Sequence, residues 1–111
     1  LSDGESARLI GLRQMSGAFR TNISVTNTGS STARVSVTLF AANGDELHEY
    51  TLWAAAGMVV QDIEPFRTRA EQPDLGWGFA VVEVVEGTGV LTSATVIDSK
   101  TNDGMTVPMK Y

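Results

Sequence analysis

The chain has 111 residues, a formal net charge of −5 and no cysteine. The length suits one domain covering residues 1–111, and the lack of cysteine excludes disulfides and zinc–thiolate sites. The acidity, without any run of Lys or Arg, argues against nucleic-acid partners, and no apolar run reaches the roughly 20 residues that membrane insertion requires.

The first segments of the chain indicate strands. Residues 1–7 are polar, and we expect them to form a frayed extension. Residues 8–12 (RLIGL) are a candidate edge strand. Residues 19–27 alternate with a period of two, which is typical of a strand with one wet face. Asn22 lies on the predicted wet face and begins an Asn-Ile-Ser glycosylation sequon.

A hairpin is predicted next. Residues 33–41 alternate again, and Asn43-Gly44 is a strong hairpin signal. Residues 46–53 are the returning partner strand. The sequence leaves open which pair faces the core of this strand: Leu47 with Trp53, or Tyr50 with Leu52.

The middle of the chain is less regular. Residues 58–63 (MVVQDI) predict a short strand, whereas Pro65 and Pro73 rule out a continuous strand through residues 64–78. Residues 67–72 are a candidate for one helical turn.

The segment from Phe79 to Ile97 is predicted to be the central hairpin. Its two valine-rich arms favour strands, because β-branched side chains fit a pleated surface. Glu86-Gly87-Thr88-Gly89 supplies a short flexible connection. Seven or eight short strands at intervals of about ten residues predict an all-β fold, an antiparallel and immunoglobulin-like β-sandwich.

Catalytic chemistry has little support in the sequence. His48 is the single histidine, it falls within a predicted strand, and no G-x-S-x-G motif is present. Glu83 has no identifiable carboxylate partner for glycoside hydrolysis. We therefore expect that the chain is not an enzyme.

An oxygen-rich loop follows the predicted central hairpin. Asp98, Asn102 and Asp103 are candidate calcium ligands, because calcium takes six to eight oxygen ligands. Against this, Lys100 interrupts the loop, no glutamate closes it, and Asn and Asp are also ordinary turn residues. The expectation is that no cofactor is needed, with calcium as the alternative.

Three aromatic residues flank the irregular segment and are candidates for ligand binding: Trp53, Phe66 and Trp77. Exposed aromatic faces on a β-sandwich can stack on sugar rings or anchor a protein partner. The other interpretation is that these side chains pack in the core.

Several motifs resemble a β-sandwich module of secreted bacterial proteins. They are FRTN (19–22), VTNTG (25–29), VSVTL (35–39), GFAVVEV (78–84), ATVIDSKT (94–101) and VP (107–108). The resemblance covers most of the chain after Leu12 and implies an immunoglobulin-like accessory domain without catalytic residues. The chain departs from it at residues 64–75, which are longer and more charged.

These observations predict a non-catalytic module of an extracellular or cell-surface bacterial protein, acting in adhesion, assembly or as a spacer. The alternative is a carbohydrate-binding module stabilised by calcium. The expected partner is a protein or a glycan, or a second copy of the chain. Because the sequence begins at Leu1 rather than Met, we expect a processed product or an excised segment.

Overall fold

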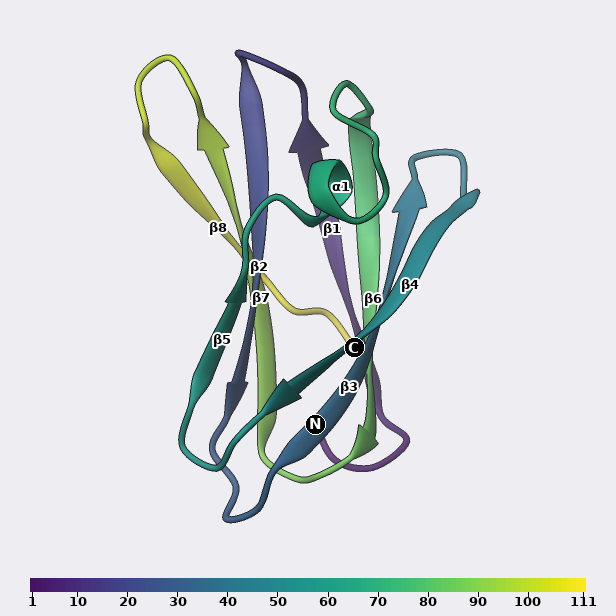
Figure 1. The fold of residues 1–111 in the computed structure, drawn as a ribbon, viewed down its shortest axis with the longest axis vertical. Helices are drawn as coiled ribbons and strands as arrows, with labels where there is room; N and C mark the ends of the chain where they lie inside the picture. Colours follow the sequence, from purple (N-terminus) through teal and green to yellow (C-terminus); the bar gives the residue numbers. More distant parts are fainter.

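The computed structural model describes residues 1–111 as two four-stranded antiparallel sheets packed face to face (Figure 1). The elements in chain order are β1 (Ser6–Gln14), β2 (Phe19–Asn27), β3 (Ala33–Ala41), β4 (Glu46–Ala54), β5 (Val59–Asp62), α1 (Pro65–Thr68), β6 (Gly76–Glu86), β7 (Val90–Asp98) and β8 (Gly104–Pro108). The predicted all-β antiparallel sandwich is confirmed.

One sheet has the order β1-β6-β3-β4 and the other β5-β2-β7-β8. Strand β1 packs against β7 and β8, and β4 packs against β5, so the edge strands of the two layers face each other. Immunoglobulin domains place their first two strands side by side in one sheet, whereas here β1 and β2 lie in different layers. The likeness to that class therefore concerns the two-layer architecture and not the strand order.

The predicted central hairpin is wrong, although both of its strands exist. Strand β6 pairs with β1 and β3, whereas β7 pairs with β2 and β8, so residues 87–89 cross between the layers. Gly87 and Gly89 have φ values of 135° and 67°, which favour glycine. A Cβ atom on Gly87 would lie 2.7 Å from the Cβ atom of Ala33, so any side chain at position 87 would clash with Ala33.

The predicted Asn43-Gly44 hairpin is confirmed, because β3 and β4 pair in antiparallel register around it. Gly44 has φ of 95°, as such a tight turn requires. Tyr50 and Leu52 face the core from β4, while Trp53 is 60% exposed. The structure thus shows that Tyr50 and Leu52, and not Leu47 and Trp53, form the buried face of this strand.

Strand β8 has no counterpart among the strands that the sequence predicts.

The N-terminal residues are held in place, so the expected fraying of residues 1–7 is not found. The Leu1 ammonium donates a hydrogen bond to the Val90 carbonyl (2.8 Å), and the Val90 amide donates to the Leu1 carbonyl (3.0 Å). The Gly4 amide donates to the Val84 carbonyl (2.8 Å), and Ala7 is buried. These contacts tie the start of the chain to β6 in one sheet and to β7 in the other.

The helical turn α1 lies across the end of the sandwich where β1 ends and β6 begins (Figure 1). It begins at Pro65, earlier than the predicted 67–72, because proline suits the first helical position. Nothing helical in the structure has the length and apolar character needed to cross a bilayer.

Candidate binding pocket at the edge between β1 and β8

A pocket of about 280 Å³ opens between the two sheets at the edge formed by β1 and β8. Trp77 from β6, Phe19 from β2 and Met105 from β8 contribute its apolar walls. Arg13 from β1 contributes a cation, and the β7–β8 segment adds carboxylates. The pocket is the single cavity of this kind in the molecule.

The local backbone explains why this edge is open. An extra residue in β1 shifts its register against β6 between Leu9 and Leu12, and Gly11 has φ of 78° there. Such a bulge bends an edge strand away from regular pairing. Nearby, Arg8 and Lys110 exchange two backbone hydrogen bonds of 2.6 and 2.9 Å, which close the edge beside the pocket.

Arg13 lies between two aromatic rings of the pocket. Its Cζ atom is 3.7 Å from the ring centroid of Phe19 and 4.4 Å from that of Trp77. The Arg13 backbone is fixed by Thr21, whose hydroxyl accepts from the Arg13 amide (3.1 Å) and donates to the Arg13 carbonyl (2.6 Å). Its Nε atom is buried without a hydrogen-bond partner.

Two of the three predicted calcium ligands, Asp98 and Asp103, line this pocket. Asp98 Oδ1 accepts from the Lys100 amide (2.9 Å), and the Asp98 amide donates to the Asp103 carbonyl (2.9 Å). Asn102 does not line the pocket, and its Oδ1 accepts from Arg20 (3.3 Å). No group of three or more His, Cys, Asp or Glu side chains is arranged around a common point.

The three aromatic candidates lie in different places. Trp77 is 54% exposed and lines the pocket. Trp53 is also exposed, but it pairs with Arg34 at the other end of the sheet, roughly 25 Å away along the strands. The expected exposure of Phe66 is wrong: its side chain is 0% exposed and belongs to the core.

Sequence reasoning missed Arg13 and Phe19 as pocket residues. The strand predicted over residues 8–12 stops one residue before Arg13, whereas β1 continues to Gln14. The alternation of residues 19–27 placed Phe19 at the end of a strand, but no local pattern marks an arginine that reaches across a sheet edge.

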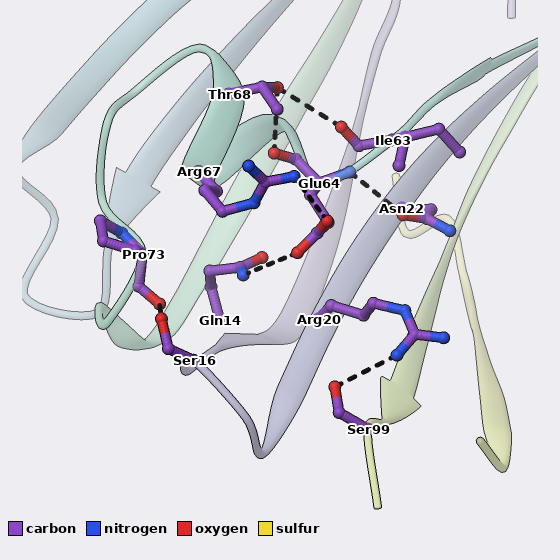
Figure 2. A network of polar contacts seen from close by, with 10 residues as sticks. All are labelled: Gln14, Ser16, Arg20, Asn22, Ile63, Glu64, Arg67, Thr68, Pro73 and Ser99. Carbon is purple, nitrogen blue, oxygen red and sulfur yellow. Dashed lines mark hydrogen bonds and ion pairs between the residues drawn. The ribbon is translucent and has the colours of Figure 1, made fainter.

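A polar cluster around Glu64 joins α1 to the end of β1 and to β2 (Figure 2). Glu64 accepts hydrogen bonds from Gln14 (3.3 Å) and Arg67 (2.8 Å), and its amide donates to Asn22 (3.1 Å). The hydrogen bond from Arg67 is the main cause that lowers the pKa of Glu64. Asn22 is 8% exposed, so the wet-face prediction for it is wrong and the sequon is inaccessible.

Another cluster closes the opposite edge, between β4 and β5. Arg69 lies 4.0 Å above the Tyr50 ring and forms a 2.8 Å ion pair with Asp62. Burial raises the pKa of Tyr50, and the nearby Asp62 charge adds to this effect. His48 stacks on Tyr50 with ring centroids 6.0 Å apart and is exposed. The chain's single histidine is therefore far from the pocket.

No protein-family model matches this sequence, and no curated protein matches it. Among solved structures, the crystal structure of Thermotoga maritima 1070 is similar with a TM-score of 0.73 and 11% identity, covering 100% of this chain and 97% of that one. The Anabaena sensory rhodopsin transducer is similar with a TM-score of 0.63 and 14% identity, covering 86% of this chain and 99% of that one. Similarity at this level of identity concerns the fold alone.

Proposed function

We propose that this chain is a non-catalytic binding module whose pocket between β1 and β8 holds a sugar ring. The observation that carries the proposal is the meeting of Trp77 with Asp98 and Asp103 in one pocket. A sugar offers an apolar face that stacks on an indole ring, and hydroxyl groups that donate to carboxylates. Ligand pockets commonly combine apolar walls with a few polar groups in this way.

The chemistry of the pocket supports binding without a reaction. Hydrolysis by two carboxyl groups requires one of them to stay protonated, which needs an apolar and water-poor environment. Asp103 is exposed and Asp98 is half-buried, so water reaches both. The pocket lining contains no serine, cysteine or histidine that could act as a nucleophile or base.

Replacing Trp77 with alanine is expected to lower sugar affinity at least tenfold, because the stacking surface is lost. Trp53→Ala is the matched control, since it removes the other exposed tryptophan and leaves Trp77 as the single indole reporter. A panel of oligosaccharides should quench the fluorescence of Trp53→Ala and not that of Trp77→Ala, and calorimetry measures both affinities. The absence of binding to every glycan tested would refute the proposal.

The proposal includes no cofactor. We expect the thermal unfolding midpoint to stay unchanged when EDTA is added and when calcium is supplied. The Arg20 guanidinium already bonds to Asn102, which supports this expectation because calcium would have to displace it. A midpoint that falls with EDTA and is restored by calcium would instead favour a site at Asp98, Asn102 and Asp103.

A second candidate function is protein assembly in a secreted or surface bacterial protein, where the domain acts as an adhesion unit or spacer. The motif resemblance supports this setting, and the exposed Trp53 and Val85 on one sheet offer an apolar contact for a protein or a second copy. The Anabaena protein is named a transducer of a sensory rhodopsin, which is a role toward another protein. Concentration-dependent light scattering that Trp53→Ser abolishes would support assembly, and a strict monomer would oppose self-association.

A further inference from the structure

Arg13 is the pocket group whose bonding capacity is left unused. The two salt bridges of the molecule are Glu64–Arg67 and Asp62–Arg69, so Arg13 pairs with neither pocket aspartate. Its Nε atom is buried out of a ligand's reach, whereas its two terminal nitrogens make no hydrogen bond within the chain. A guanidinium offers five N–H donors in a planar fork, which matches the two oxygens of a carboxylate.

The position of this fork is fixed before any ligand arrives. Phe19 and Trp77 each lie within 4.4 Å of the Arg13 Cζ atom, and Thr21 holds its backbone through two hydrogen bonds. A side chain held between aromatic rings loses little further freedom on binding, which favours affinity. Arg13 is therefore a preorganised donor and not a flexible surface charge.

Arg34 shows that an unpartnered arginine alone does not make a site. Its Cζ atom lies 5.4 Å from the Trp53 ring, and its Nε atom is also buried without a partner. No pocket includes Arg34 or Trp53. What distinguishes Arg13 is that Phe19, Trp77 and the two aspartates line a cavity large enough for a sugar ring beside it.

We infer that the pocket selects a sugar that carries a carboxylate, that is, a uronic acid. This inference rests on the proposed sugar-binding function. The sugar carboxylate accepts two hydrogen bonds from Arg13, and ring hydroxyls donate to Asp98 and Asp103 on the other side of the pocket. The apolar face of the ring contacts Trp77.

Other small anions fit these charges less well. A phosphate carries up to two negative charges and would face both aspartates, with one arginine to balance them. A uronic acid carries one charge, and its hydroxyl groups supply the donors that the aspartates need. A neutral sugar leaves the guanidinium with hydroxyl acceptors alone, which form weaker bonds than a carboxylate.

The test compares monomeric galacturonate with its methyl ester, at constant ionic strength. We expect the acid form to bind at least tenfold more tightly to the native chain. Arg13→Gln should lower the affinity for the acid at least tenfold and lower the ester affinity by a clearly smaller factor. Arg13→Lys keeps the charge without the fork and should fall between the two.

Arg34→Gln is the matched control, because it removes the corresponding arginine beside the other exposed tryptophan and should leave both affinities unchanged. Thermal midpoints of all variants establish that each is folded. Equal binding of acid and ester, unaffected by Arg13→Gln, would overturn this inference and leave sugar binding intact. No binding of either form by the folded native chain would overturn the inference for this pocket together with sugar binding.

Discussion

Replacing Phe66 with alanine is expected to lower the free energy of unfolding by about 3–5 kcal/mol, the usual cost of removing a buried aromatic side chain. Phe66 is among the largest fully buried side chains and belongs to the core cluster. It is anchored from α1, and its ring lies 3.1 Å from the point where a Cβ atom on Gly78 would be. Gly78 in β6 has no side chain where the ring lies, so nothing from this strand can fill the cavity that Phe66→Ala creates.

The control for this prediction is Phe40→Ala. Phe40 stacks on Phe79 with centroids 4.7 Å apart, but both rings are half-exposed on the outer face of the sheet. Its loss should cost about 1 kcal/mol, because little cavity forms at a surface. Urea unfolding followed by fluorescence measures both variants. Equal losses of unfolding free energy for Phe66→Ala and Phe40→Ala would contradict the prediction that the Phe66 ring stabilises the core at this end.

The sequence predicted elements where the signal is local. Strands β2 and β3 begin and end where the alternation predicted. Side chains two positions apart lie on the same face of a strand, so a short stretch of sequence shows which face is buried. The Asn43-Gly44 turn was predictable for the same reason. Gly87 and Gly89 also indicated a turn, but residue type does not tell whether a turn joins neighbours in one sheet or crosses to the other.

The pocket depends on contacts between distant segments. Trp77 and the pair Asp98 and Asp103 were proposed separately, for a sugar or partner and for calcium. They meet because β6 pairs with β1 while β7 pairs with β8, and these pairings have no local signature. Phe66 was misassigned because its flanking Pro65 and charged neighbours suggest a surface loop. The turn α1 instead folds back over the end of the sandwich.

Asn27→Ala is expected to lower the free energy of unfolding by about 2–4 kcal/mol, because it removes three hydrogen bonds of a buried side chain at once. Asn27 is 0% exposed at the end of β2. Its amide donates to the carbonyls of Ser31 (2.7 Å) and Ala54 (2.9 Å), and its Oδ1 accepts from the Gly29 amide (2.9 Å). One side chain thereby ties the β2–β3 turn to the link between β4 and β5.

The Asn27→Asp variant separates the roles of the two ends of this amide. Aspartate keeps the acceptor for Gly29 but places a carboxylate against two carbonyl oxygens, so it should destabilise at least as much as alanine at neutral pH. Asn43→Ala, which removes a side chain that bonds within an exposed turn, should cost less than 1 kcal/mol. Urea midpoints for the three variants give the comparison. If Asn27→Asp kept native stability at neutral pH, the donation to the Ala54 carbonyl would not join the two layers at this end.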